Sequence, residues 1–367
     1  MNSARFWLIA VLLVATGSPA RAGFLERWFR RAGELDELNS QLNGRVLDFT
    51  ANHGVDRRIY SAALCEKRDL YVYLPPGYDP NYQYPLVYFL HGIGHDERGF
   101  LEFIDLFDRA MACGTLTRAI IVCPDGTISG RPSLVNAGSF YVNSKAGRFE
   151  DYTMQDVWNF MHQNFPIRPE REAHAMVGGS MGGFGAYNLA IKYRDRVSMV
   201  AAIFPPLNLR YVDCHGRYFT DFDPCCFGWR TQLHPHAPVG RYYGVIIVRQ
   251  RRLIDPLYGR RSPDALANIA RENPVEMLET YNVKPGELDM FVGYVGRDEF
   301  NIDAQIDSFL YIARSKGLTV TSVYDPNLHH NVKSGRKMTP SLIAWLSAKL
   351  ESHGPIPIAK PAAAKAP

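Results

Sequence analysis

The segment 173–186 constrains the fold of this chain more than any other part of it. It begins with an apolar stretch typical of a strand, passes through Gly-Gly-Ser-Met-Gly, and continues in small residues typical of a closely packed helix. A serine can stand in so sharp a turn only when its neighbours lack bulk, because strand and helix nearly touch there. Gly178 and Gly182 meet that requirement, so the pattern predicts a strand, a tight turn at Ser180 and a helix.

Ser180 is the candidate nucleophile. The turn projects its hydroxyl from the end of a strand, at a helix N-terminus whose dipole favours developing negative charge. Gly179 and Gly183 give the turn further clearance. The alternative interpretation is a glycine-rich turn with an incidental serine, but the strand before it and the helix after it favour the nucleophile.

Strand and helix patterns alternate along most of the chain. Apolar runs typical of buried strands lie at 86–90, 119–123, 173–177, 198–204, 288–294 and 318–324. Helical patterns lie between them, around 100–112, 152–164, 182–193, 302–316 and 339–350. This alternation predicts an α/β fold with a mainly parallel, doubly wound sheet and helices on both faces. Two earlier strands, 58–61 and 69–74, are expected to form an antiparallel edge.

The length of 367 residues and the hydrophobic content of 46% suit one large α/β core. We expect a single domain at 23–353, followed by a Pro/Ala/Lys-rich tail at 354–367 that is disordered. The net charge of +4 is mild and is not concentrated on one segment, so the sequence indicates no nucleic-acid partner.

Residues 1–22 have the features of a secretory signal peptide. Arg5 supplies positive charge before the apolar run 6–15, which is too short to span a bilayer. Residues 20–22 form an A-x-A cleavage site. We therefore expect a secreted or periplasmic protein without a stable membrane anchor.

Residues 205–273 interrupt the alternation of strands and helices. They contain several aromatic side chains and many arginines. A structureless loop of this length is uncommon inside a domain unless it is functional. We interpret the segment as a lid-like insertion, and the alternative is a decorative insertion held by disulfides.

Export also bears on the cysteines, which are Cys65, Cys113, Cys123, Cys214, Cys225 and Cys226. An oxidising compartment permits disulfides, and the last three cysteines lie close together in the insertion, where a disulfide would staple it. The alternative is a metal site that includes the nearby His215, His234 and His236, but their spacing matches no zinc pattern. We favour a disulfide over a metal, and the pairing stays open.

A serine nucleophile needs a base and an acid that orients the base. In this strand–turn–helix arrangement the chain order is serine, acid, histidine. Asp298 follows the predicted strand 288–294 and is the preferred acid, because loops at strand ends carry function in open α/β sheets. Its alternative role is to cap the following helix, and the neighbouring carboxylates are Glu299 and Asp303.

Two adjacent histidines, His329 and His330, lie between the last predicted strand and the last helix. Only one of them can face Ser180. We favour His330 as the base, with support from the family resemblance described below, and His329 would then contact backbone or substrate.

An oxyanion hole needs two backbone N–H groups aimed at one point. The residue after the nucleophile, Met181, supplies one of them. The loop that follows the strand 86–90 supplies the other, and Ile93 is the preferred donor.

Four further residues are candidates for substrate binding. His91 and Gly92 begin the loop that carries Ile93, and we expect His91 to orient this loop rather than to act as a base. Tyr141 and Asn143 lie in a polar stretch before the turn and are expected to line the pocket, with loop capping as their alternative role.

Four segments together match a known family pattern: V-Y-L-P-P-G-Y at 72–78, Y-P-L-V-Y-F-L-H-G at 84–92, G-S-M-G-G at 179–183 and G-R-D-E at 296–299. They resemble the putative-esterase family of α/β-hydrolases. That family includes esterase D, feruloyl and acetyl-xylan esterases, enterochelin esterases and the antigen 85 mycolyltransferases. The resemblance spans about 45–205 and 285–350.

The resemblance implies an α/β-hydrolase fold and serine esterase activity that uses neither a metal nor an organic cofactor. By resemblance, the triad maps to Ser180, Asp298 and His330. The family often has Pro-x-Gly-x-His before the final helix, whereas this chain has Leu328 at the glycine position. The insertion matches none of the named members, so the substrate is not carried over.

We therefore expect an exported serine esterase that hydrolyses carboxylic esters, such as acylated polysaccharides, through an acyl-enzyme. Its partner would be a small-molecule or polysaccharide ester. One alternative is acyl transfer to an alcohol, of the mycolyltransferase type, if the lid excludes water. Another is a non-catalytic binding protein on a hydrolase scaffold, because a fold does not determine a function. A peptidase or a lipase would use the same triad.

Overall fold

The computed structural model describes residues 33–133, 138–242 and 245–358. The predicted signal peptide at 1–22 and the end of the tail, from 359 onwards, lie outside these residues. Within the described part of the chain, no helix is both long and apolar enough to cross a membrane.

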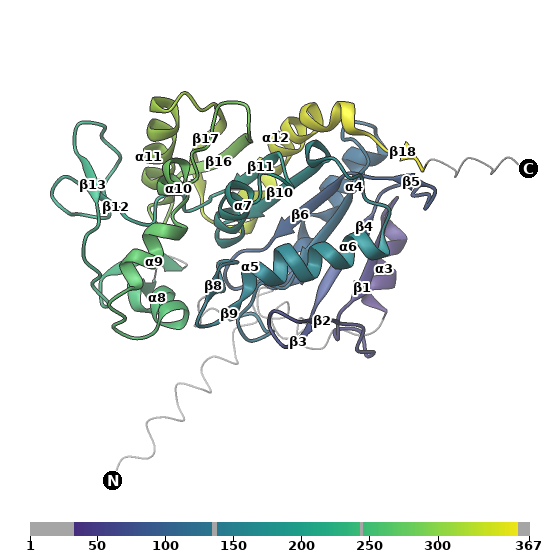
Figure 1. The fold of residues 1–367 in the computed structure, drawn as a ribbon, viewed down its shortest axis with the longest axis horizontal. Helices are drawn as coiled ribbons and strands as arrows, with labels where there is room; N and C mark the ends of the chain where they lie inside the picture. The colour runs from purple at the N-terminus through teal and green to yellow at the C-terminus, as the bar shows by residue number, and fades with distance from the viewer. Residues whose placement is uncertain (1–32, 134–137, 243–244, 359–367) are drawn as a thin grey trace, which may run out of the picture.

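A central sheet of eight strands organises the molecule, in the order β1-β4-β7-β6-β10-β11-β16-β17 (Figure 1). Its parallel strands are β6 (Leu86–Leu90), β7 (Ile120–Pro124), β10 (His174–Gly179), β11 (Met199–Ile203), β16 (Asp289–Arg297) and β17 (Val320–His329). Beyond β7, the sheet continues with the antiparallel strands β4 (Leu70–Leu74) and β1 (Arg45–Phe49). The predicted mainly parallel sheet is confirmed.

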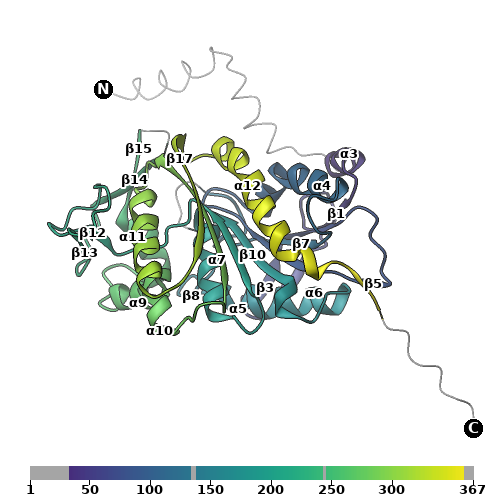
Figure 2. The same cartoon turned by 90° about the horizontal axis from the view of Figure 1, so that it is seen from above.

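Helices cover both faces of the sheet (Figure 2). One face carries α5 (Phe149–Asp151), the π-helical turn η3 (Tyr152–Val157), α6 (Trp158–Asn164), α7 (Met181–Lys192), α10 (Pro274–Thr280) and α11 (Ile302–Ser315). The other face carries α3 (Glu34–Gln41), η2 (Glu97–Glu102), α4 (Ile104–Ala112) and α12 (Val332–Leu350). The fold is thus doubly wound, as predicted.

The strands bury both of their faces. In β6, Leu86, Tyr88 and Leu90 belong to one hydrophobic core, whereas Val87 and Phe89 belong to the other. Successive side chains of a strand point to opposite faces of the sheet, and each face here has its own layer of helices. This two-sided burial explains why the strand is apolar at every position.

The antiparallel edge differs from the prediction. The segment 58–61 forms β2 (Ile59–Ser61), which pairs with β3 (Glu66–Arg68) in a separate hairpin. The edge strand of the central sheet is β1 instead. Its sequence, R-V-L-D-F, buries only Val46 fully, so it lacks the apolar run by which the central strands are recognised.

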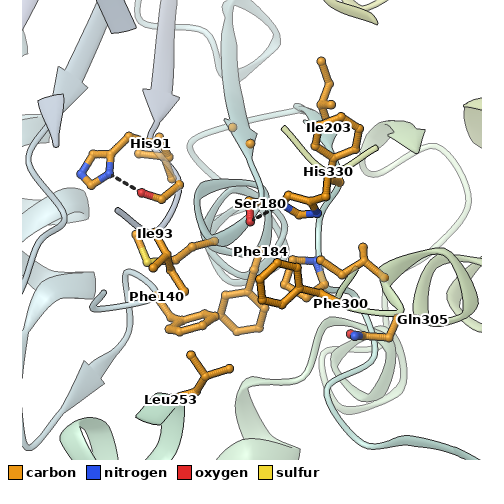
Figure 3. Close-up of a pocket in the computed structure, with 18 of the residues that line it drawn as sticks. His91, Ile93, Phe140, Ser180, Phe184, Ile203, Leu253, Phe300, Gln305 and His330 are labelled. Atoms are coloured by element: carbon orange, nitrogen blue, oxygen red, sulfur yellow. Dashed lines mark hydrogen bonds between the residues drawn. The ribbon is translucent and has the colours of Figure 1, made fainter. Parts of the chain in front are cut away.

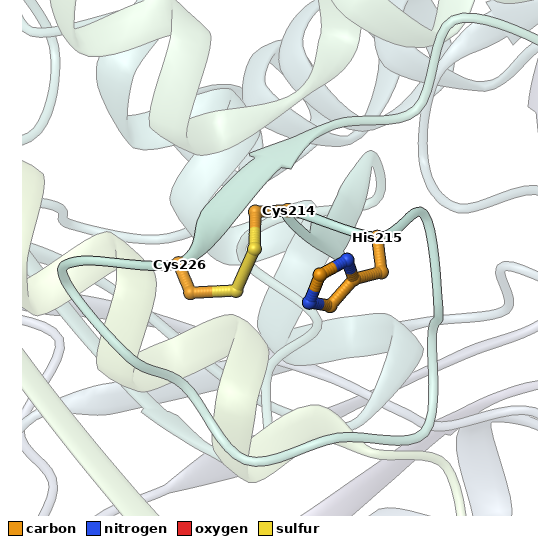
Figure 4. Close-up of side chains that lie close together, drawn as sticks. All are labelled: Cys214, His215 and Cys226. Carbon is orange, nitrogen blue, oxygen red and sulfur yellow. A yellow bond between two sulfur atoms is a disulfide. The ribbon is translucent and has the colours of Figure 1, made fainter.

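The insertion contains secondary structure of its own. Its elements are β12 (Tyr211–Asp213), β13 (Phe227–Trp229), β14 (Pro238–Tyr242), β15 (Ile246–Arg249), α8 (Gln250–Tyr258) and α9 (Ala265–Glu272). The hairpin of β12 and β13 protrudes at the end of the molecule opposite β1 (Figure 1). Cys214 and Cys226 form a disulfide that closes the loop between these two strands, as Figure 4 shows, so the predicted staple is present and Cys225 is left as an exposed thiol.

Short elements complete the fold: β5 (Tyr82–Gln83), β8 (Asn143–Ser144), β9 (Gly147–Arg148), η4 (Arg171–Ala173), η5 (Glu351–His353) and β18 (Ile356–Pro357). The start of the expected disordered tail differs from the prediction, because β18 pairs with β5. The backbone of Ile358 also donates a hydrogen bond to the carbonyl oxygen of Asn81. Main-chain pairing therefore orders residues whose composition alone indicates disorder.

Candidate active site

The turn between β10 and α7 holds Ser180 in a strained conformation. Its φ of 54° and ψ of −120° lie in a region that residues other than glycine rarely adopt. The N–H of Ser180 donates to the carbonyl oxygen of Ile203 on the adjacent strand, at 2.9 Å. This bond ties the turn to β11.

The glycines around Ser180 are required to different degrees. A Cβ at Gly178 would overlap the backbone of Gly182, and a Cβ at Gly182 would overlap the carbonyl oxygen of Leu90. A Cβ at Gly183 would lie 3.0 Å from the Cβ of Pro205, whereas the atom nearest to a Cβ at Gly179 would be the carbonyl oxygen of Ile203, at 3.9 Å. The close approach of strand and helix therefore depends on Gly178 and Gly182, as the sequence pattern predicts.

Three predicted catalytic side chains form one chain of hydrogen bonds. The Nε2 atom of His330 lies 2.9 Å from the Oγ atom of Ser180 (Figure 3). Its Nδ1 atom lies 2.9 Å from Oδ2 of Asp298. The carboxylate accepts a hydrogen bond from Nδ1–H, which leaves the unprotonated Nε2 to accept a hydrogen bond from the Ser180 hydroxyl. The other carboxylate oxygen of Asp298 accepts from the N–H of Phe300 at 2.8 Å.

The charge of Asp298 alters the basicity of His330. Burial of the ring lowers its pKa, but the nearby negative charge of Asp298, the hydrogen bond to it and the charge of Glu299 outweigh that effect. The pKa of His330 is therefore raised above its ordinary value of 6.5. Phe204 and Phe300 flank the imidazole, with ring centroids 5.0 and 5.3 Å away, and limit its movement.

Glu299 is a site residue to which the sequence analysis gave no role of its own. One of its carboxylate oxygens lies 2.9 Å from Nδ1 of His329, and the other accepts the backbone N–H of His330 at 3.2 Å. These contacts pair the His329 ring with Glu299, whereas the His330 ring bonds Ser180 and Asp298. They arise because the parallel register of β16 and β17 pairs Arg297 with His329.

The two residues predicted to supply the oxyanion hole line the same cavity as Ser180. Met181 is the first residue of α7, and Ile93 lies in the loop after β6. A Cβ at Gly92 would be 3.4 Å from the Cβ of Ser180, so this loop passes directly beside the nucleophile.

His91 holds that loop in place. Its Nε2 atom accepts the backbone N–H of Gly126 at 2.8 Å, so the ring proton is on Nδ1, which donates to the carbonyl oxygen of Gly92 at 3.0 Å (Figure 3). The hydrogen bond fixes the planar peptide group that joins Gly92 to Ile93. His91 thus orients the loop, as expected.

The other two candidates for substrate binding lie elsewhere. Tyr141 is fully buried, and its hydroxyl donates to the backbone oxygen of His91 at 3.2 Å. Asn143 accepts the backbone N–H of Asp151 at 3.3 Å. Neither lines the cavity, and their neighbours Phe140 and Val142 line it instead. The prediction rested on polarity, whereas the wall at this point is apolar.

A cavity of about 480 Å³ opens beside Ser180. Residues from β10, α7, the loops after β6 and β16, α12 and the insertion line it. Figure 3 shows Phe140, Phe184 and Leu253 together on one side of Ser180, where they form an apolar wall. Leu253, Ile254 and Leu257 of α8 show that the insertion supplies part of this wall. Such a size and lining suit a small organic ligand.

The cysteine cluster does not offer the ligand set of a metal site. Cys214, His215 and Cys226 lie within 4.8 Å of one another, but their two sulfur atoms are joined to each other (Figure 4). A metal ligand must be a thiolate, which a disulfide is not.

Comparisons with known proteins agree on a family. The family model described as "Putative esterase" matches residues 61–282. An esterase of Mycobacterium tuberculosis, Esterase Rv1288, is 31% identical over 230 residues, which are 62% of this chain and 43% of that protein. The corresponding esterase of a second strain matches equally well. The chain thus spans less than half the length of these curated relatives.

Solved structures share the fold. A ferulic acid esterase has a TM-score of 0.59 at 16% identity, over 84% of this chain and 99% of that chain. An S-formylglutathione hydrolase from Agrobacterium tumefaciens also has a TM-score of 0.59 at 16% identity, over 84% and 96% of the two chains. A fluorophosphonate-binding serine hydrolase of Staphylococcus aureus has a TM-score of 0.56 at 15% identity, over 83% and 98%. The architecture is that of an α/β-hydrolase.

Proposed function

The chain belongs to the putative esterase family, and from this premise we propose that it is a serine esterase in which Ser180, His330 and Asp298 form the triad. The observation that carries the proposal is the continuous chain of hydrogen bonds from the Ser180 hydroxyl through His330 to the Asp298 carboxylate. The substrate is a carboxylic ester bound in the cavity beside Ser180.

The first half of the reaction forms an acyl-enzyme. His330 accepts the hydroxyl proton of Ser180 while Oγ attacks the ester carbonyl carbon. Asp298 keeps the Nδ1–H tautomer and stabilises the imidazolium. The tetrahedral intermediate collapses when His330 returns the proton to the leaving alcohol.

The oxyanion is held by backbone N–H groups. We assign this role to Met181, at the N-terminus of α7, and to Ile93. Both donors belong to segments that are already fixed, by the helix in one case and by His91 in the other. Such preorganised donors contribute about 3–4 kcal/mol each to transition-state stabilisation.

The second half of the reaction consumes water. His330 removes a proton from a water molecule, which attacks the acyl carbon, and the returning proton releases Ser180 with the carboxylic acid. An acceptor alcohol in place of water would give acyl transfer, which product analysis with added alcohol distinguishes from hydrolysis.

The test is hydrolysis of 4-nitrophenyl esters from acetate to octanoate, together with methyl ferulate. We expect turnover by the wild type and a loss of roughly a thousandfold or more in Ser180→Ala. Ser315→Ala is a matched control, because this exposed serine only bonds its own helix backbone. Undiminished turnover in Ser180→Ala would remove Ser180 from the mechanism.

We also propose that the protein is exported, with cleavage after Ala22. The pattern of residues 1–22 supports this, as does the Cys214–Cys226 disulfide, which is typical of oxidising compartments. N-terminal sequencing of the protein recovered from outside the cytoplasm should begin at Gly23. Recovery of the intact N-terminus from the cytoplasm alone would contradict export.

A further inference from the structure

The cavity that contains Ser180 carries more positive charge than its own residues neutralise. Three arginines line it: Arg210, Arg230 and Arg241. Among the described residues that line the cavity, Glu299 is the one with an acidic side chain. Arg210 is neutralised, because its Nη1 atom lies 2.6 Å from a carboxylate oxygen of Glu276.

Glu299 does not neutralise the other two arginines. Its two carboxylate oxygens are occupied by Nδ1 of His329 and by the backbone N–H of His330. Among the described residues, the side chains of Arg230 and Arg241 form no hydrogen bond or ion pair. Two guanidinium groups on the cavity therefore have no anionic partner in this part of the chain.

Arg230 is the more confined of the two. Its guanidinium lies over the ring of Tyr218, 5.0 Å from the centroid, and the side chain is only partly exposed. None of its nitrogen atoms is among the fully buried polar atoms that lack a partner, so the group keeps accessible surface where it lines the cavity. Burial lowers the pKa of Arg230, and the interaction with Tyr218 offsets this effect only in part.

Hydrogen bonds connect the residues around both arginines to the loop after β16, which carries Asp298 and is called the catalytic loop below. The Tyr218 hydroxyl donates to the carbonyl oxygen of Phe300 at 2.6 Å and accepts from Gln305 at 2.9 Å. The backbone N–H of Arg241 donates to the carbonyl oxygen of Glu299 at 3.1 Å. The ring beneath the Arg230 guanidinium and the backbone of Arg241 are thus both tied to the loop that carries Asp298, whereas the Arg241 side chain is exposed.

We propose that the substrate of this esterase carries, in addition to the scissile ester, an anionic oxyacid group that Arg230 binds with help from Arg241. The inference rests on the proposed function, since it names the substrate class of the same cavity. A partly buried cation without a counterion is costly, and a bound carboxylate or phosphate would remove that cost. The planar guanidinium fork matches both anions.

Matched pairs of esters test the proposal. On the alcohol side, 4-acetoxybenzoate is compared with its methyl ester, and 4-acetoxyphenyl phosphate tests a phosphate at the same position. On the acyl side, 4-nitrophenyl hydrogen adipate is compared with its methyl ester. Phenol release is measured for each, and we expect kcat/KM for one anionic probe to exceed its neutral partner by roughly tenfold or more.

Variants identify the group responsible. Arg230→Gln should lower kcat/KM for the anionic esters far more than for their neutral partners and so abolish the anionic preference, and Arg230→Lys should restore part of it. Arg251→Gln is the matched control, because Arg251 is an exposed arginine of the insertion that does not line the cavity. Added salt should reduce the preference in the wild type.

A binding measurement tests the anion preference independently of catalysis. The unreactive amide 4-acetamidobenzoate and N-(4-nitrophenyl)adipamic acid, each beside its methyl ester, are titrated into Ser180→Ala by calorimetry. We expect the free acid of one pair to bind more tightly, and the difference to vanish when Arg230→Gln is added. Equal binding of acids and methyl esters, or a preference that survives both Arg230→Gln and Arg241→Gln, overturns the proposal. If the wild type hydrolysed none of these esters but Ser180→Ala still bound the free acids more tightly than their methyl esters, the result would count against the proposed reaction and not against the anion site.

Discussion

At the scale of single residues, two glycines beside Ser180 differ sharply in their tolerance for a side chain. We expect Gly182→Ala to lower the free energy of unfolding by roughly 3 kcal/mol, because its Cβ would overlap the backbone oxygen of Leu90 and neither strand nor helix can retreat. Gly179→Ala is the control, since the nearest atom to its Cβ is 3.9 Å away. Urea unfolding measures both, and equal losses would contradict the steric explanation.

The pH dependence of activity follows from the charges around His330. The base must be neutral, so kcat/KM should fall as the pH drops through a His330 pKa that lies above 6.5. The negative charge of Glu299 helps to raise that pKa, and Glu299→Gln should therefore move the acid limb to lower pH. Asp325→Asn is the control, because that carboxylate pairs with Lys337. A pH profile that is unchanged in Glu299→Gln, or displaced to higher pH, would refute this assignment.

The sequence indicates some site residues and conceals others for a physical reason. Ser180 stands in a local strand–turn–helix pattern, which selects it. Asp298 and His330 each follow a recognisable strand, which narrows the choice to a few neighbouring residues, and the family resemblance favours His330 over His329. The role of Glu299 depends on the register between β16 and β17, which no local pattern encodes. Arg230 likewise reaches the cavity only through tertiary packing on Tyr218.

At the scale of elements, the disulfide loop joins the protruding hairpin to the catalytic loop. Tyr218 lies between Cys214 and Cys226, and the backbone oxygen of Tyr218 accepts from Asn301 at 2.7 Å. We expect the double variant Cys214→Ser/Cys226→Ser to be cleaved within this loop roughly tenfold faster by a protease, because the open loop gains entropy. Reductant should have the same effect on the wild type and none on the variant. Equal protease resistance with and without the disulfide would contradict this prediction.

The strands that could be predicted from the sequence are those that are buried on both faces of the sheet. The parallel strands β6 and β11 are apolar throughout because helices cover both of their faces. The edge strand β1 has a single fully buried residue, Val46, and therefore no periodic signal. The short strand β18 consists of Ile356 and Pro357, and it exists through pairing with β5 rather than through its own composition.

At the scale of the whole molecule, the cavity is assembled from segments that are distant in the chain. The core sheet supplies the reacting groups, whereas the insertion supplies Arg230 on one wall and α8 on another. The sequence indicates that an insertion exists, because it breaks the alternation of strands and helices. Its path over the site depends on contacts such as that between Gly240 and the Phe300 ring, so the shape of the cavity could not be predicted.

The apolar wall of the insertion should set the length of the acyl group. Leu253 lies beside Phe140 and Phe184 in the cavity (Figure 3), and Leu253→Trp would fill the space between them. Each buried methylene contributes about 0.8 kcal/mol, so loss of four of them would lower kcat/KM for octanoate by roughly two-hundredfold at most. We expect 4-nitrophenyl octanoate to lose roughly tenfold or more while the acetate ester changes little. Leu253→Met conserves volume and is the control. Equal losses for acetate and octanoate would show that α8 supports the fold without limiting the acyl chain.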